Sequence, residues 1–223
     1  MKRERIKIAS SILALLVAGA AIWRSLHDGP PSGPAAIHRE VGRVLAEEAG
    51  KRIQPGGRIV VIYRDTESFP QPAFDVALKA LLGGLKDAGL PAPITRAIQL
   101  DPLRPLQVPP GDFLELIRKA GVADVIVSLM GPPFLSDEQR ATVGMVKPRI
   151  VAFWPGTIAE YANLKPLFEQ HLLSAAIVHR PEALGFAGTA RGGNRAALPE
   201  RFDALYQVVS GNGIPSVPIP GLP

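Results

Sequence analysis

The chain has 223 residues, which is enough for one domain with appendages but not for two full hydrophobic cores. It carries a net charge of +5, yet residues 1–27 hold five Lys or Arg against one acid, which leaves 20 basic and 19 acidic residues in 28–223. A body this close to neutral has no basic stripe for nucleic acid, and the absence of cysteine excludes disulfides and Cys-ligated zinc or iron–sulfur sites.

The N-terminal segment, residues 1–27, predicts a membrane anchor. Four cations precede an uncharged run of 16 residues (8–23), and Arg24 closes it. As a helix the run is about 24 Å long, and the flanking Lys7 and Arg24 can snorkel, so that it can span a hydrocarbon core of about 30 Å. We expect a single-pass helix in the inner membrane, with a cytoplasmic N-terminus and a periplasmic, extracytoplasmic body. The alternative is a signal peptide cleaved near Ala20, with a secreted body.

The segment after the anchor predicts a short linker and then a helix. Residues 28–34 are rich in turn formers, and residues 35–50 have a helical apolar pattern. The apolar residues recur on one face, at Ile37, Val41, Val44, Leu45 and Ala49. Gly50 suits the C-terminal end of this amphipathic helix, and His38 is expected to be a partly exposed surface histidine.

Five runs predict strands, and amphipathic segments separate them. The runs at 58–63 and 124–129 are apolar enough to predict buried strands. The strands are expected at residues 58–63, 94–98, 124–129, 149–154 and 173–179. The intervening helices are expected at 73–88, from Asp112, from Ser136 and from Thr157, the last two at capping-box spacings.

The alternation of strands and helices predicts the fold class. Parallel strands need crossovers, and right-handed crossovers place helices on both faces of a sheet. We therefore predict an α/β domain over residues 51–184, with a doubly wound, mainly parallel five-stranded sheet of the flavodoxin-like kind. Residues 185–223 form a Gly/Pro-rich C-terminal extension, with one helix expected at 199–209.

The motifs of common catalytic and cofactor sites are absent from the sequence. It contains no phosphate-binding P-loop, no dinucleotide fingerprint after the first strand, no G-x-S-x-G and no H-E-x-x-H. The four histidines lie in different elements, so neither a metal site nor a cofactor is predicted. Asp65 and Glu67 form a carboxylate pair, but neighbouring acids in a loop are usually only solvated, and no catalytic residue is assigned.

Polar residues follow the ends of several predicted strands. In doubly wound sheets the ligand crevice lies outside the carboxyl ends of the strands, where the strand order reverses. The ligand-binding residues expected at that edge are Arg64, Asp65, Thr66, Ser68, Ser128, Trp154, Thr157, His179 and Arg180. They offer hydrogen-bonding groups, two cations and an aromatic platform. Because every doubly wound domain ends its strands in polar loops, a plain connector is the alternative interpretation.

The run "RIVVIYRDTESFPQPAFDVALKALLGGLKDAGL", followed by "ADVIVSL", resembles the N-terminal lobe of type 1 periplasmic substrate-binding proteins. In that family a strand leads into a polar, aromatic loop, a long helix follows, and a later strand begins with an Asp, as at Asp124. The resemblance covers about 80 residues and implies a single lobe, without the family's second lobe. It also implies that the cleft is lined by Asp65, Thr66, Ser68 and Phe69, with Ser128 and Met130 near its floor.

Together these features predict a membrane-anchored extracytoplasmic domain that binds a small solute or an envelope protein, without catalysis. The Pro-rich end of the chain favours a protein partner, because pre-extended segments dock at low entropic cost. The alternative is an extracytoplasmic enzyme, a hydrolase or transferase, that acts through the strand-end loops. Clustering of Asp65, Thr66 and His179 would favour the enzyme, and a shallow crevice beside an exposed apolar patch would favour a protein-binding module.

Overall fold

The computed structural model describes residues 34–67, 70–100, 107–133, 135–144, 147–154, 164–180 and 201–210. The predicted anchor, nearly all of the predicted linker and most of the predicted C-terminal extension lie outside these described residues. Among the described helices, none has both the length and the apolar character needed to cross a membrane.

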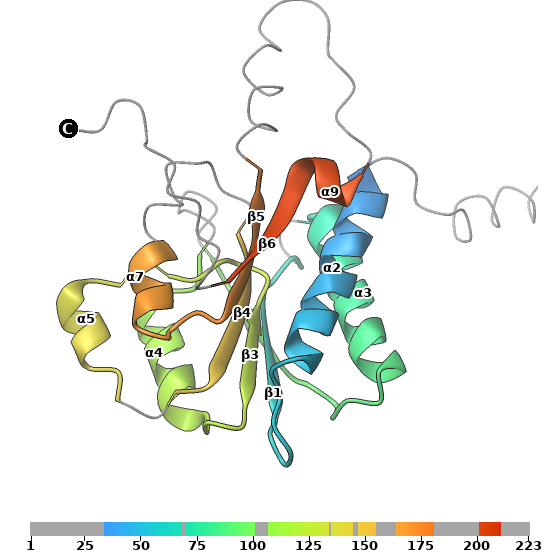
Figure 1. Cartoon of the computed structure of the whole chain (residues 1–223). Coiled ribbons are helices and arrows are strands. Elements are labelled where there is room, and N and C mark those ends of the chain that lie inside the picture. Colours follow the sequence, from blue (N-terminus) through green and yellow to red (C-terminus); the bar gives the residue numbers. More distant parts are fainter. Residues whose placement is uncertain are drawn as a thin grey trace, which may run out of the picture. The chain divides into compact units, whose positions relative to one another are not determined.

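One sheet with helices on both faces makes up the described part of the chain (Figure 1). Its strands are β1 (Ile59–Arg64), β2 (Ile94–Ile98), β3 (Val125–Ser128), β4 (Arg149–Trp154), β5 (Ala175–His179) and β6 (Tyr206–Val209). The described helices are α2 (Pro34–Gly50), α3 (Pro72–Asp87), α4 (Pro110–Lys119), α5 (Asp137–Ala141), α7 (Leu164–Glu169) and α9 (Phe202–Leu205).

The strand order is β2-β1-β3-β4-β5-β6, and the pairs from β2 to β5 are all parallel. The chain passes from β1 to β2 on one side and then returns past β1 to β3 on the other. Right-handed crossovers therefore place α3 and α4 on opposite faces of the sheet. Figure 1 shows α2 and α3 on one face and α4, α5 and α7 on the other. The predicted doubly wound, mainly parallel sheet is thus confirmed, and its order reverses between β1 and β3.

A sixth strand corrects the predicted count of five. The helix expected at 199–209 is confined to α9, and the chain continues as β6, antiparallel to β5. The sequence Tyr-Gln-Val-Val favours an extended backbone, because β-branched and aromatic side chains fit a pleated surface. Pairing with β5 buries Tyr206 and Val209, whereas Val208 stays 41% exposed. Tertiary pairing thus outweighs the helical spacing of the apolar residues.

The core consists of two apolar layers, one on each face of the sheet. Along β1 the side chains of Ile59 and Val61 enter the layer under α2 and α3, whereas Val60 and Ile62 enter the layer under α4 and α7. All four are buried, between 0 and 8% exposed. The continuous apolar run that predicted this strand therefore reflects burial on both faces.

Helices α2 and α3 approach each other closely through small residues. A Cβ on Gly42 would overlap the carbonyl oxygen of Ala77 and lie 2.8 Å from the Cβ of Ala80. One turn further along, a Cβ on Gly84 would lie 2.9 Å from the Cβ of Ala46. The predicted amphipathic helix at 35–50 therefore packs as part of the domain, on α3 and on the sheet.

Asp124 fastens the starts of β1 and β3. Asp124 is 4% exposed, and its carboxylate accepts hydrogen bonds from the backbone N–H of Arg58 (2.8 Å) and of Gly121 (2.8 Å). The Arg58 guanidinium donates a third bond of 2.6 Å. Burial raises the pKa of Asp124, but the Arg58 and Gly121 hydrogen bonds outweigh it and hold that pKa below its usual value.

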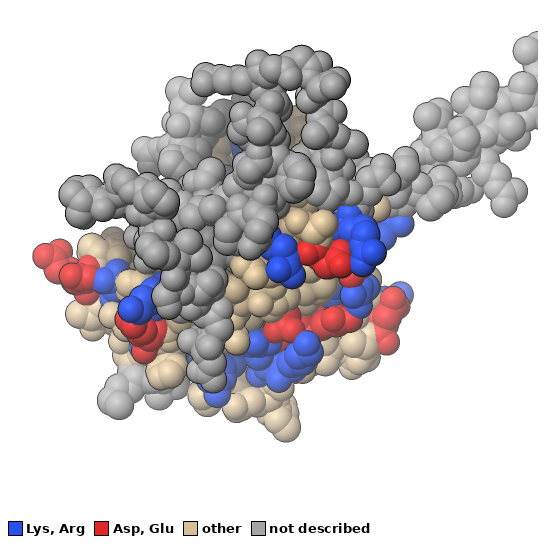
Figure 2. All heavy atoms as spheres, turned by 45° about the horizontal axis from the view of Figure 1, so that its top comes forward, with Lys and Arg blue, Asp and Glu red and all other residues tan. Residues whose placement is uncertain are grey.

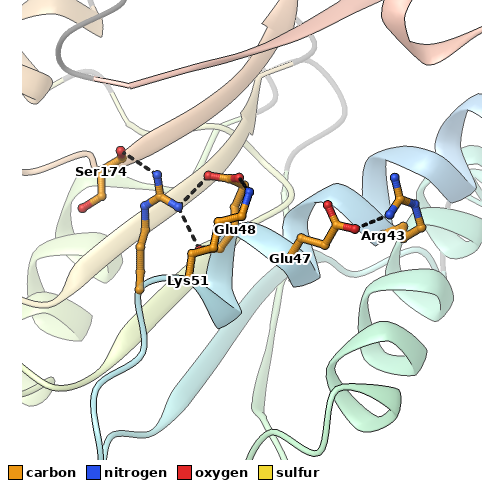
Figure 3. A network of polar contacts seen from close by, with 6 residues as sticks. Arg43, Glu47, Glu48, Lys51 and Ser174 are labelled. Atoms are coloured by element: carbon orange, nitrogen blue, oxygen red, sulfur yellow. Dashed lines mark hydrogen bonds and ion pairs between the residues drawn. The ribbon is translucent and has the colours of Figure 1, made fainter.

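A second charged network fastens the end of α2 to the start of β5 (Figure 3). The buried Glu48 accepts hydrogen bonds from Lys51 (2.6 Å) and Arg52 (2.5 Å). Arg52 also donates to the backbone carbonyl of Ser174, at 3.3 Å. Burial raises the pKa of Glu48, but its two cationic partners outweigh that effect and lower the pKa overall. Buried charge at this edge of the sheet is therefore paired.

The close α2–α3 contact predicts opposite effects for two Gly→Ala substitutions. Gly42→Ala adds a methyl group where none fits, and we expect it to lower the free energy of unfolding by about 1–3 kcal/mol. Gly83→Ala, in α3 with no atom within 4 Å of its Cβ, serves as the control and should raise stability by about 0.5–1 kcal/mol. Urea unfolding followed by circular dichroism measures both, and a Gly42→Ala variant as stable as the wild type would contradict the packing.

Asp124→Asn should cost about 1–3 kcal/mol at pH 7, because it leaves buried hydrogen-bond groups unmatched. The folded pKa of Asp124 lies below its ordinary value of 3.8, so its contribution is complete above that value and is lost as the pH falls through the folded pKa. The stability difference from the wild type should therefore shrink from pH 5 to pH 2. Urea unfolding at each pH tests this, with Asp87→Asn on the exposed end of α3 as the control. A constant difference would contradict it.

Candidate functional site

The carboxyl-end edge of the parallel strands is the place where the sequence predicts a ligand crevice. β1 to β5 all end at this edge, which is at the top of the sheet in Figure 1. Within it, the reversal of strand order lies between β1 and β3, whose residues Ile62 and Ser128 pair. A turned view that brings this edge forward shows acidic and basic side chains interspersed over the described surface (Figure 2), as the near-neutral composition predicts.

Arg64 is the last residue of β1 and lies directly beside this reversal. By strand alternation its side chain is on the same face as Val60 and Ile62, the face covered by α4. The side chain is half-buried, and its Nε atom is buried without a hydrogen-bond partner in the described part of the chain. Arg64 thus has a buried donor that no described residue accepts.

One other described arginine, Arg140 of α5, also has a buried Nε without a partner. Its remaining nitrogens are engaged, since one donates to the carbonyl of Leu135 at 2.6 Å and another pairs with the carboxylate of Asp137. Arg140 therefore has a local structural role. Arg64 differs because no described residue forms a hydrogen bond or an ion pair with its guanidinium group.

Asp65 and Thr66 continue the edge after Arg64. The Asp65 carboxylate accepts the backbone N–H of Glu67 (3.0 Å) and the side-chain amide of Gln99 (3.3 Å). The Thr66 hydroxyl donates to the carboxylate of Asp75 in the first turn of α3, at 2.9 Å. These bonds link residues 65–67 to the end of β2 and to the first turn of α3.

Ser128, at the end of β3, is used within its own turn. It is fully buried, its Oγ donates to the carbonyl of Gly131 (2.9 Å), and the backbone N–H of Met130 donates back to that Oγ (3.2 Å). Gly131 has a φ of +71°, which favours glycine, and the Trp154 ring lies 3.6 Å from where a Cβ would be. Ser128 and Trp154, the latter 8% exposed, form the packed wall of the edge.

His179 and Arg180, at the end of β5, bind to β6 and α9. The His179 ring lies 4.5 Å from the Tyr206 ring, centroid to centroid. The backbone N–H of Arg180 donates to the carbonyl of Leu205 (2.8 Å), and its Nε donates to the carbonyl of Tyr206 (3.2 Å). This group is on the α2 face, close enough to His38 for that histidine to lower the pKa of His179.

The seven predicted site residues that the structure describes therefore do not all lie together. Arg64, Asp65 and Thr66 lie together beside the buried Ser128. His179 and Arg180 are three strands away from β1, at about 14 Å for a usual spacing of about 4.8 Å between strands. Ser68 and Thr157, like Phe69 of the resemblance, lie outside the described residues.

Two polar residues of this edge were not predicted from the sequence. Gln99 follows β2 directly, and Asp75 lies in the first turn of α3. The rule that selects residues at strand ends would have found Gln99. No comparable signal marks Asp75, because an acid in the first turn of a helix is ordinarily placed there by the helix dipole. Within the described residues, no group of three or more His, Asp or Glu side chains is arranged to hold a metal ion.

Comparisons with protein-family models and with curated proteins give no match. Among solved structures, the chain is similar to AraP, an arabinose binding protein from Geobacillus stearothermophilus, at 13% identity, a TM-score of 0.49, and coverage of 79% of this chain and 62% of AraP. It is also similar to a sugar-binding protein from Bacillus halodurans (14%, 0.49, 79% and 63%). A third is a solute binding protein from Burkholderia graminis in complex with D-arabinose (17%, 0.48, 81% and 62%).

The match thus spans less than two thirds of each of these proteins. They are sugar- or solute-binding proteins by name, and a further similar structure is described as a periplasmic ribose ABC transporter from Conexibacter woesei. The likeness is one of backbone arrangement, at identities of 11 to 17%.

His38 of α2 and His179 at the end of β5 predict a pH dependence of stability. Burial lowers the pKa of both His38 and His179 from the ordinary value of 6.5. The unfolded chain therefore takes up more protons below pH 6.5, and stability should fall as the pH decreases from 6.5 toward the folded pKa values. The double substitution His38→Gln, His179→Gln should reduce the fall in Tm between pH 7.5 and pH 5.

Thermal unfolding at a series of pH values measures this effect. His171→Asn is the control, because His171 is exposed and has a φ of +56°, a conformation that asparagine tolerates. A double variant that loses as much Tm as the wild type would show that these histidines do not titrate in a buried setting.

Proposed function

We propose that the chain is a binding protein for a small, oxygen-rich polar solute, which it holds at the carboxyl ends of β1 and β3. The observation that carries this proposal is the half-buried side chain of Arg64, whose buried Nε has no hydrogen-bond partner among the described residues. Leaving a buried donor without a partner costs about 1–3 kcal/mol, so such a group is retained where a ligand supplies the missing acceptor.

The chemistry of the edge indicates the class of solute. A guanidinium presents several N–H donors in a planar fork that matches a carboxylate or a pair of adjacent oxygen atoms. Beside it, Asp65 supplies acceptor oxygens, and Thr66 and Gln99 add a hydroxyl and an amide. A sugar or a small hydroxy acid offers both donors and acceptors. Either would form hydrogen bonds with these exposed groups in place of those between the side chains.

Binding without catalysis suits the described geometry better than an enzyme. The enzyme alternative required Asp65 and Thr66 to approach His179, but β3 and β4 lie between them. His179 instead packs against Tyr206. We further propose that residues 1–27 anchor the domain in the inner membrane and expose it on the extracytoplasmic side, a proposal supported by the cluster of cations that precedes the apolar run.

Arg64→Ala tests the binding proposal. Thermal shift of the full chain against pentoses, hexoses and small hydroxy acids, with D-arabinose, D-ribose and malate as first probes, should give at least one solute that raises Tm. Calorimetry with that solute should show about 10- to 100-fold weaker binding to Arg64→Ala, as expected for loss of hydrogen bonds from a charged donor. Arg64→Lys should fall between the two, because lysine keeps the charge but not the fork.

Arg149→Ala is the matched control, since Arg149 is an exposed arginine at the start of β4, on the opposite edge of the sheet. It should bind the solute as the wild type does. Wild-type affinity in Arg64→Ala would refute the proposed site, and the absence of any Tm shift across the probe set would refute a sugar or hydroxy acid as the solute.

A further inference from the structure

The outer edge of β2 is an unusually open part of the described sheet. Four of the five residues of β2 are exposed, and Ile94, an apolar residue, is 41% exposed. No described strand pairs with the outer side of β2. The other edge strand, β6, is better covered, because its first and last residues are buried. An open edge offers a row of backbone donors and acceptors to another strand.

The backbone groups that face outward on β2 can be assigned. The carbonyl of Ile98 accepts the backbone N–H of Asp65, at 2.9 Å, so the backbone groups of Ile98 point toward β1. Because backbone direction alternates along a strand, the N–H and C=O groups of Thr95, Ala97 and Gln99 point away from the sheet. These three residues therefore present the hydrogen-bonding groups of the edge.

A groove of about 230 Å³ runs beside this edge, between β2 and α4. Its floor on β2 includes Arg96 and Ile98, and its wall on α4 includes Asp112, Glu115 and Lys119. Glu115 and Lys119 form an ion pair along the helix, and hydrogen bonding to Lys119 lowers the pKa of Glu115, with a smaller effect from Arg96. The groove thus contains two acids and two bases.

The charges on α4 change from acidic to basic along the groove. A crossover helix runs antiparallel to its strands, so Asp112 in the first turn of α4 is near the carboxyl-end edge and Lys119 in the last turn is near the opposite edge. A two-fold rotation about an axis perpendicular to the sheet reverses this order. It sets Lys119 of one copy opposite Asp112 of the other, on both sides of the axis.

We propose that two copies of this chain associate through β2, antiparallel, so that their sheets join into one continuous sheet across a two-fold axis at Ala97. In this register the outward groups of Ala97 bond to those of its counterpart, and Thr95 bonds to Gln99 of the other copy. On the α4 face, Ile94 meets Leu100 of the other copy.

Neighbouring registers are less favourable. An axis at Arg96 sets the two Arg96 side chains directly opposite each other, which is destabilising for like charges. An axis at Thr95 brings Pro91 and Pro93 into the paired region, and proline has no N–H for the ladder. Ala97 is small and exposed, and the segment from Ile94 to Leu100 contains no proline. The proposed partner is thus β2 of a second copy. After the two-fold rotation, the charges of one copy lie opposite unlike charges of the other, and the two β2 strands pair in register.

Single-cysteine crosslinking tests the arrangement, and the natural chain contains no cysteine to interfere. Ala97→Cys in the full chain should give a covalent dimer on mild oxidation or with a short bis-maleimide, because residues paired on adjacent strands meet the distance needed for a disulfide. Val208→Cys, exposed on the opposite edge strand, is the control and should stay monomeric. An Ala97→Cys variant that does not crosslink, or a Val208→Cys variant that crosslinks equally, overturns the proposal.

A charge exchange gives an independent readout by analytical ultracentrifugation. Asp112→Lys and Lys119→Asp each place like charges opposite one another, and each should weaken the dimer about tenfold, since two equivalent pairs are affected. The double variant restores opposite charges across the axis and should recover the dimer. A wild-type chain that stays monomeric, single variants that dimerise as the wild type does, or a double variant that stays as weak as the single ones overturns the proposal. Circular dichroism checks that all variants are folded.

Discussion

The position of β1 between β2 and β3, buried on both faces, is the constraint from which the rest of the fold follows. Its residues Ile59 to Ile62 contribute alternately to two apolar layers, and each layer needs a cover of helices. Because the chain leaves β1 for β2 and returns to β3, α3 and α4 are placed on opposite faces. The connections after β1 and β3 therefore diverge, and Arg64 lies where they separate.

Buried charged groups are paired at the starts of the strands but not all of them at the carboxyl ends. At the start of the strands, Asp124 accepts hydrogen bonds from Arg58 and from Gly121, and Glu48 binds two cations. Buried charge there is satisfied within the chain and holds strands and helices together. At the carboxyl-end edge, the guanidinium of Arg64 is half-buried and unmatched among the described residues. The start of the strands, where buried charges are paired, therefore stabilises the domain. The carboxyl-end edge, where the Nε of Arg64 has no described partner, is the part proposed to bind.

The sequence predicted the five parallel strands well. Continuous β-branched runs report burial on both faces in β1 and β3, whereas β2 is mostly exposed. It missed β6 because Phe202, Leu205, Tyr206 and Val209 have helical spacing, and only pairing with β5 selects the strand. The rule that polar residues follow strand ends predicted Arg64. Sequence alone does not show whether such a side chain is available to a ligand or bonds within its own turn, as Ser128 does. It also does not show that β3 and β4 separate His179 from Arg64.

Chemical-shift mapping tests the site at the end of β1 and β3 most directly. The ¹⁵N-labelled full chain is titrated with the solute that raises its Tm, and its backbone amides and the Arg64 Nε–H are followed by NMR. Binding at the proposed site shifts the signal of the Arg64 Nε–H together with amides of residues 64–67 and 129–131. Shifts confined to the groove between β2 and α4, or to the start of the strands, would contradict it.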